Sequence, residues 1–206
     1  MAGVGQVRAV PLPQPEESNK TCLRLVTDLS RVMPADLRLD FDVAGFSLET
    51  NFIGVAMDDV GVQLISSNQC QLRNLATGYH LVRAFLVYSD HTCVKSDMAY
   101  VEAEFYVKRQ LVQLERPFMF GQPSIITIQA DQVIDFFVHN VDLSPETYAV
   151  RIVVDNEVVD DVDEWVPYEL EGLQPGEHTL RLTLINTFGE EITTPKYNAM
   201  VHTFFT

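Results

Sequence analysis

Long hydrophobic runs, paired cysteines and positive charge are all scarce in this chain of 206 residues. No apolar stretch approaches the roughly 18 residues that a transmembrane helix needs, so we expect no insertion into a membrane. The 14 Lys and Arg residues are outnumbered by 29 Asp and Glu residues, which gives a formal net charge of −15. Such a charge repels phosphate backbones and anionic lipid, and it argues against nucleic acid as a partner.

The cysteines form a poor disulfide framework, because there are three of them and none lies in the second half of the chain. Cys22, Cys70 and Cys93 show no CxxC spacing, and only His91 lies close to one of them in sequence. We therefore expect buried free thiols, and no metal or cofactor. The first ten residues lack the basic start and apolar core of a secretory signal, which favours an intracellular protein.

The chain repeats itself at an offset of 98 residues. Six identical pairs share this register: Leu72 and Leu170, Leu75 and Leu173, Gly78 and Gly176, His80 and His178, Arg83 and Arg181, Leu86 and Leu184. Looser pairs in the flanks are Val55 and Val153, Val60 and Val158, Leu39 and Phe137, and Val43 and Val141. We expect two copies of one module, over residues 21–108 and 117–206, with a join over 108–117.

An extended tail is predicted over residues 1–20, because its prolines and acidic residues cannot form a core. Three roles are open for this tail: a tether, a strand donated to a neighbour, or a disordered segment.

Within each copy the hydrophobic pattern has a period of two, which is typical of strands with one buried face. In the first copy Leu37, Leu39 and Phe41 alternate with polar residues, and in the second Leu180 and Leu182 do the same. Short strands at regular spacing, separated by turns with Pro and Gly, indicate an all-β antiparallel sandwich.

One stretch resembles a known family. The sequence from Gly172 to Leu182, followed by Asn186 and Gly189, is similar to the region between strands E and F of fibronectin type III and related immunoglobulin-like sandwiches. In those families a leucine and a Pro-Gly turn precede a strand that carries a tyrosine corner. Here His178, and His80 in the first copy, stand about where that tyrosine falls. The resemblance implies two tandem immunoglobulin-like antiparallel β-sandwiches and assigns no functional residue.

The two equivalent histidines favour a structural role. A histidine just after a glycine turn can donate a ring N–H to a carbonyl and so lock the corner. Catalysis would require a nucleophile or carboxylate beside each of them, and no known catalytic signature occurs in the sequence. We expect that the protein is not an enzyme.

The second copy carries most of the charge. From Pro117 onward there are 15 carboxylates and three basic residues, and eight of the carboxylates fall between Asp155 and Glu171. Candidate contact residues in this run are Asp160, Asp161, Asp163 and Glu164. Three interpretations stay open: a calcium site, which lacks the order of an EF-hand loop, a contact with a cationic protein surface, and plain solvated charge.

The two copies differ on one strand. Leu81, Phe85 and Val87 of the first copy stand where the second copy has Thr179, Thr183 and Ile185. If the intervening residues point into the core, these three form an apolar stripe on the outer face. The stripe is either covered by another part of the chain or is a docking face for another protein.

Trp165, close to Pro167 and Tyr168, could present a flat ring to a sugar, although a core plug at the mouth of a sandwich is the plainer interpretation. The favoured function is a non-catalytic protein-interaction or assembly module, with another protein as partner. Alternatives are a carbohydrate-binding module, with a glycan as ligand, and a calcium-stabilised adhesion module.

Overall fold

The computed structural model describes residues 7–13, 20–58, 60–108, 124–130, 133–192 and 199–205. Most of the predicted join over residues 108–117 lies outside the described residues, as do parts of the predicted tail. The chain divides into two compact units. The N-terminal unit comprises Glu16–Ser89 and Cys93–Gly121, and the C-terminal unit comprises Met1–Pro15, Asp90–Thr92 and Gln122–Thr206.

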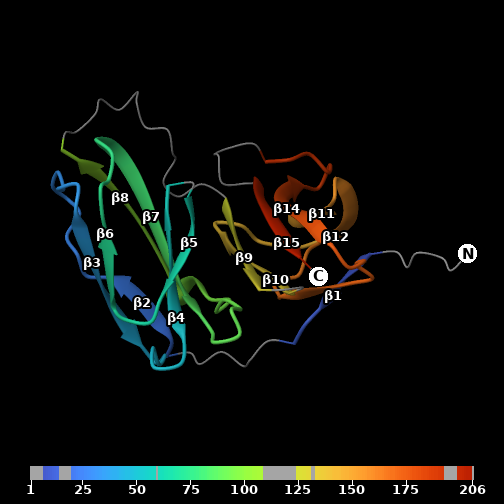
Figure 1. Ribbon diagram of the computed structural model, residues 1–206, viewed down its shortest axis with the longest axis horizontal. Helices are drawn as coiled ribbons and strands as arrows, with labels where there is room; N and C mark the ends of the chain where they lie inside the picture. The colour runs from blue at the N-terminus through green and yellow to red at the C-terminus, as the bar shows by residue number, and fades with distance from the viewer. Residues whose placement is uncertain are drawn as a thin grey trace, which may run out of the picture. The chain divides into compact units, whose positions relative to one another are not determined.

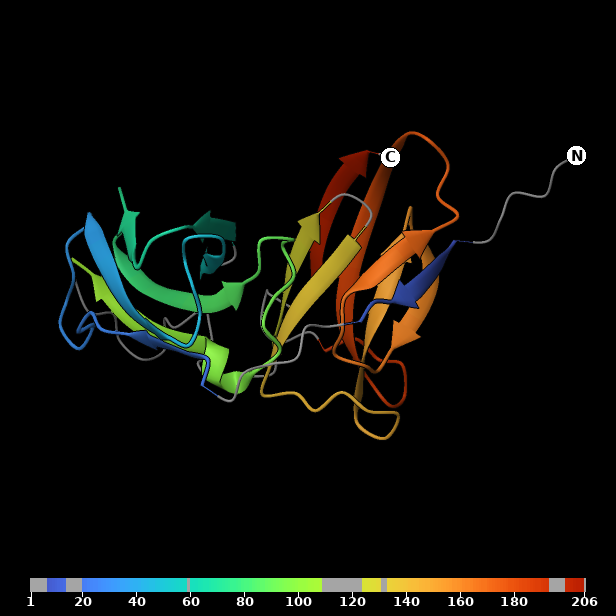
Figure 2. The same ribbon diagram turned by 90° about the horizontal axis from the view of Figure 1, so that it is seen from below.

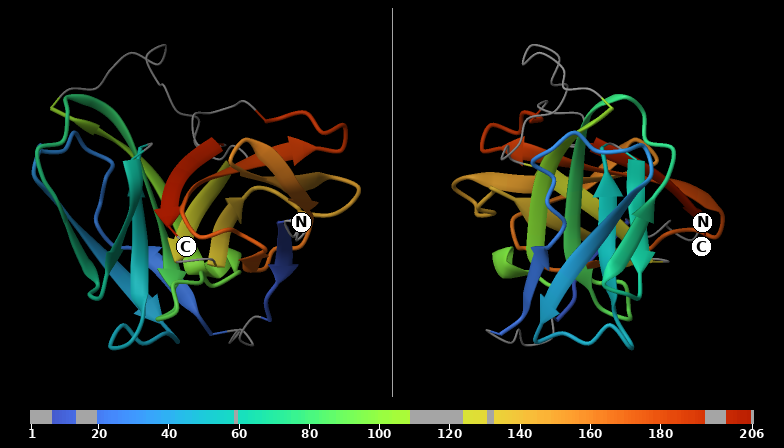
Figure 3. Two further views of the ribbon diagram at one scale, coloured as in Figure 1. Left: turned by 45° about the vertical axis from the view of Figure 1, so that its right-hand side comes forward. Right: turned by 90° about the vertical axis from the view of Figure 1, so that its left-hand side faces the viewer.

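The N-terminal unit contains two sheets whose strands pair antiparallel (Figure 3). The first sheet has the order β2 (Cys22–Leu25), β3 (Leu37–Ala44), β6 (Gln69–Leu72). The second has the order β5 (Val60–Ile65), β4 (Phe52–Met57), β7 (Gly78–Val87), β8 (Tyr100–Val107). A short 3-10 helix, η1 (Asp97–Ala99), precedes β8. No helix in the described part of the chain is long and apolar enough to cross a membrane.

The C-terminal unit also contains two antiparallel sheets. One has the order β12 (Glu157–Val162), β11 (Tyr148–Val154), β14 (Glu177–Asn186), β15 (Ala199–Phe205). The other has the order β1 (Arg8–Pro11), β13 (Tyr168–Glu171), β10 (Val133–His139), β9 (Ser124–Ala130). Part of the predicted tail is thus strand β1, which lies beside β13 at the edge of this sheet (Figures 1 and 2).

Each unit has its own apolar core between its two sheets, as the period of two predicts. Leu37, Leu39 and Phe41 of β3 are buried, while the residues between them are more exposed. They pack in one cluster with residues of the facing sheet such as Ile53 and Leu86. The C-terminal cluster is built in the same way. The predicted all-β, immunoglobulin-like sandwich architecture is confirmed.

The correspondence between the units follows the 98-residue offset in β6 and β13 but not in the strands before them. Cys70 pairs with Leu39, and Tyr168, which corresponds to Cys70, pairs with Ile134. Leu39 therefore corresponds to Ile134. The four predicted flank pairs, Val55 and Val153, Val60 and Val158, Leu39 and Phe137, Val43 and Val141, are wrong by one to three residues. Connecting segments of different length cause the shift. An extra residue in a loop of one unit changes the sequence offset between all equivalent strands that precede that loop.

The apolar stripe predicted on β7 is covered, which agrees with the first of its two interpretations. Leu81 is 2% exposed, and Phe85 and Val87 are 0% exposed. All ten residues of β7 are buried, so neither face of this central strand meets solvent. Phe85 packs over the bare backbone of Gly54 on the neighbouring strand, where a Cβ atom would lie 2.8 Å from two ring carbons. The alternation of a strand predicts which side chains share a face, but not whether that face is covered.

The close packing at Gly54 yields a first prediction. Gly54→Ala should lower the free energy of unfolding by about 1–3 kcal/mol, because the added methyl group forces the Phe85 ring out of place. Gly61→Ala is the matched control, since a Cβ atom there meets nothing within 4 Å. Urea denaturation of both variants measures the difference. Equal stability of the two variants would show that Phe85 does not depend on this gap.

Candidate functional site

The histidine of the N-terminal unit joins two segments of the chain. His80, near the start of β7, approaches the Asp58 carboxylate with Nδ1 at 2.8 Å and the carbonyl oxygen of Ala76 with Nε2 at 2.9 Å. The other oxygen of Asp58 accepts a hydrogen bond from the backbone N–H of Leu81 at 2.9 Å. Asp58 lies in the turn between β4 and β5, so the histidine ties this turn to the loop before β7.

The C-terminal unit repeats the arrangement. His178 Nδ1 lies 2.6 Å from Asp155 Oδ2, and Nε2 lies 2.7 Å from the carbonyl oxygen of Gln174. The N–H of Thr179 donates to Asp155 Oδ1 at 2.8 Å. Asp58 and Asp155 both adopt a positive φ, of 52° in each case. The sequence analysis predicted that the two histidines are equivalent and that each ring donates to a carbonyl group. It did not identify the aspartates, which are 97 rather than 98 residues apart.

Both nitrogens of each ring face hydrogen-bond acceptors, which favours the doubly protonated imidazolium. The hydrogen bond to Asp58 raises the pKa of His80 above its ordinary value, although burial opposes this rise. Hydrogen bonds to the Gln174 carbonyl and to Asp155 raise the pKa of His178. Bonds from Thr179 and His178 lower the pKa of Asp155. These rings hold the chain in place and present no free nitrogen for acid–base chemistry.

Each histidine also lines a surface cleft. In the N-terminal unit the cleft has a volume of about 430 Å³ and is bordered by β5, by β6 and by the loop that follows β6. In the C-terminal unit the corresponding cleft has a volume of about 340 Å³, and Val7, the residue before β1, contributes to its lining.

The acidic residues predicted as contacts or calcium ligands do not converge. Asp161 pairs with Arg151, and Asp160 accepts a hydrogen bond from the N–H of Asp161 at 2.9 Å. Asp163 and Glu164 follow the end of β12. In the ranges that the structure describes, no group of three or more His, Cys, Asp or Glu side chains could hold a metal ion.

Trp165 packs into the C-terminal unit. Its ring meets Phe137 edge to face, with centroids 5.0 Å apart, and its indole N–H donates to the carbonyl oxygen of Phe136 at 3.0 Å. The partly buried ring packs against the core cluster. These contacts agree with the core plug that the sequence analysis gave as the plainer interpretation.

A feature that the sequence analysis missed is the turn after β14. Phe188 at its tip is 85% exposed. Asn186 Oδ1 accepts the N–H groups of Phe188 at 2.9 Å and of Glu190 at 3.0 Å. Asn186 Nδ2 donates to the Glu190 carboxylate at 3.0 Å, and Gly189 closes the turn with a φ of 76°. A large apolar ring is thus held in solvent on a hydrogen-bonded turn.

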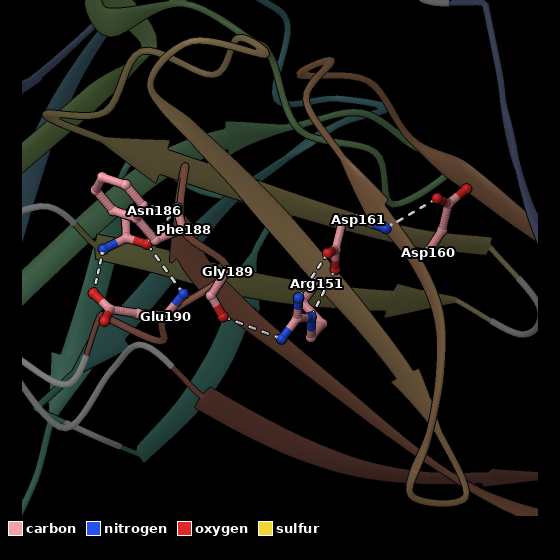
Figure 4. Close-up of polar contacts among 7 residues, drawn as sticks. All are labelled: Arg151, Asp160, Asp161, Asn186, Phe188, Gly189 and Glu190. Carbon is pink, nitrogen blue, oxygen red and sulfur yellow. Dashed lines mark hydrogen bonds and ion pairs between the residues drawn. The ribbon is translucent and has the colours of Figure 1, made fainter.

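Arg151 links this turn to the acidic strand β12 (Figure 4). Its guanidinium donates two hydrogen bonds of 2.7 Å to the two oxygens of Asp161 and a third, of 3.3 Å, to the carbonyl oxygen of Gly189. On β14, Arg181 pairs with Glu191 at 2.9 Å. We call the set of Phe188, Glu190 and Asp161 the Phe188 surface. In the sequence, Asn186 and Gly189 were the only indication of a fixed turn. The hydrophobic pattern did not indicate that Phe188 is exposed.

The chain matches no model of a protein family and no curated protein. Solved structures similar to it at low identity include the following three. Fibronectin(III)-like modules of Clostridium thermocellum CbhA are 13% identical over 89% of this chain and 93% of theirs, with a TM-score of 0.32. The central fibronectin-III array of RIM-binding protein is 12% identical over 94% of this chain and 63% of its own, with a TM-score of 0.33. Bacteroides ovatus SGBP-B, from a mixed-linkage glucan utilization locus and solved with a heptasaccharide, is 14% identical over 96% of this chain and 47% of its own, with a TM-score of 0.29.

The histidine contacts yield a prediction for one side chain. Asp58→Asn should lower the free energy of unfolding by about 1–3 kcal/mol, because it removes a charge-assisted hydrogen bond from the buried His80 ring. Asp42→Asn, at an exposed position on β3, should change stability little. Chemical denaturation of the two variants provides the comparison. If both variants unfold at the same midpoint, the contact contributes nothing to the fold.

The raised histidine pKa values predict a pH dependence. A group whose folded pKa lies above its unfolded value stabilises the fold fully below the unfolded value, about 6.5 for histidine, and loses this effect as the pH rises through the folded pKa. The urea midpoint should therefore fall between about pH 6 and about pH 8. The double variant His80→Gln, His178→Gln should show a flatter profile over the same range. A midpoint that rises across this range in the intact protein would contradict the imidazolium assignment.

Proposed function

We propose that this chain is a non-catalytic protein-interaction module whose C-terminal unit binds its partner through the Phe188 surface. The observation that carries the proposal is the 85% exposure of a phenylalanine at the tip of a turn fixed by Asn186. Two sandwich units, which we take to be copies of one module, provide the scaffold.

The geometry of the turn suits a binding contact. An aromatic side chain gains more from burial in a partner's pocket than most residues do, and a few such anchors often supply most of the binding free energy. Because hydrogen bonds already hold the backbone around Phe188, little conformational entropy is lost when it binds.

The charges around the ring indicate the chemistry of the partner. Glu190 lies two positions after Phe188 in the turn, and Glu191, which pairs with Arg181, follows. Asp160 and Asp161 lie on β12, beyond Arg151. The complementary surface is an apolar pocket bordered by Lys or Arg side chains, on a protein that a chain of net charge −15 attracts over long range. The same charge disfavours nucleic acid as a partner.

The other predicted roles have weaker support. Both nitrogens of His80 and of His178 are engaged in hydrogen bonds, which supports a non-catalytic role. Trp165 packs in the core and Asp161 is paired with Arg151, so we do not propose glycan or calcium binding there. Cys70 is buried and forms no disulfide bond, which supports an intracellular placement as part of the proposal.

A substitution tests the proposal. The intact chain and the variant Phe188→Ser are used as baits in extracts of the source cells, and each retained protein is purified and its affinity measured at two salt concentrations. Loss of the anchor should weaken binding by about tenfold or more, and salt should weaken the intact complex.

The matched control is Val26→Ser, which removes a side chain that is 62% exposed on the N-terminal unit. This variant should bind as the intact chain does. Equal retention of all proteins by the Phe188 variant would refute the proposal.

A further inference from the structure

The two units differ in the strands that flank one sheet edge. In the C-terminal unit, β13 has two neighbours, β10 on one side and β1 on the other. In the N-terminal unit the corresponding strand is β6, and among the described strands it pairs only with β3. The edge of β6 that corresponds to the β1 position therefore carries backbone groups with no strand beside them in the part of the chain that the structure describes.

The pairing of β1 with β13 shows which contacts an added strand makes at such an edge. Its residues pair antiparallel with β13, with Arg8 opposite Glu171 and Ala9 opposite Leu170. The guanidinium of Arg8 binds the Glu171 carboxylate, with Nε at 2.9 Å. Ala9 packs against the core cluster. The contact thus combines backbone pairing, a small apolar side chain over the core and one ion pair.

The corresponding positions in the N-terminal unit are Leu72, the last residue of β6, and Arg73, which follows it. The 98-residue offset, which holds here, places Leu72 opposite an incoming alanine and Arg73 opposite an incoming charged residue. Leu72 is 8% exposed, whereas Leu170 under β1 is 0% exposed. Arg73 is exposed and makes no ion pair with any residue that the structure describes.

The cleft beside this edge has an apolar part. Val55, Met57, Leu72 and Leu75 line it, together with Arg73. In the C-terminal unit Val7, next to β1, lines the smaller counterpart. The larger cleft can therefore take side chains of an added strand, as alternate side chains do in other cases of strand addition.

We propose that the β6 edge of the N-terminal unit binds an extended segment of another protein that places an acidic side chain opposite Arg73 and a small apolar side chain opposite Leu72. The charge at this position is the reverse of that in the C-terminal unit, where Glu171 selects Arg8. The reversal disfavours the β1 strand of a second copy, because its arginine would face Arg73.

The shortness of β6 does not prevent pairing. Short edge strands with polar residues often serve to avoid unwanted partners. However, β6 and β13 both have four residues, and β13 pairs with β1 over its whole length. Length alone therefore does not close this edge.

The proposal is independent of the Phe188 surface, which lies on the other unit, and two synthetic peptides test it. One peptide has the sequence of residues 7–12, and the other has Glu in place of Arg8. Each is titrated into the intact ¹⁵N-labelled chain, up to about 1 mM, and amide shifts report where it binds. The glutamate peptide should shift the amides of residues 69–73 and bind about tenfold more tightly than the native peptide.

The decisive experiment reverses the charge of Arg73 on the protein. In Arg73→Glu the order of the two peptides should invert, while Arg24→Glu, at an exposed position on β2, should leave it unchanged. Phe188→Ser should also leave both affinities unchanged, which separates this site from the proposed function. The proposal is overturned if neither peptide shifts residues 69–73, if the shifts fall on residues 168–171, or if Arg73→Glu does not invert the order. Tighter binding of the native peptide by the intact chain would instead identify a second copy as the occupant.

Discussion

The contact between an aspartate, an imidazolium and a carbonyl group is the interaction that organises both units. It joins the hairpin turn of one sheet to the loop that enters the next strand, through Asp58, His80 and Ala76 in the N-terminal unit. All three residues also line the cleft beside β6. A charged group is retained at the buried position of His80 because both nitrogens of its ring have hydrogen-bond partners.

The same scaffold supports different surfaces in the two units. In the C-terminal unit the sheet edge is completed by β1, and an exposed aromatic side chain stands on the turn after β14. In the N-terminal unit the corresponding edge is open and bears Arg73. The two proposed contacts therefore differ in sign of charge and in type, one through a side-chain anchor and the other through the backbone. Such a division would let one chain hold two unlike partners.

Much of the fold could be predicted because strand periodicity and turn residues are local signals. The alternation at Leu37, Leu39 and Phe41 identified a half-buried strand, and the offset at His80 and His178 identified equivalent corners. The close contact of Phe85 with Gly54 could not be predicted, since the two residues lie on different strands. Phe188 was missed for a different reason, because burial is the default for phenylalanine and only the contacts of the turn show otherwise.

The pairing of β1 with β13 bears on the order in which the chain folds. Arg8 and Glu171 are separated by 163 positions in sequence, and the N-terminal unit is encoded between them. During synthesis β1 emerges well before its partner, which follows 163 positions later. The N-terminal unit can fold before β1 pairs with β13. The sheet that contains β1 is therefore completed late, and its closure has a large entropic cost because the intervening loop is long. Removing the first fifteen residues to trim an apparent tail would uncover the edge above Leu170 and leave that sheet without its outermost strand.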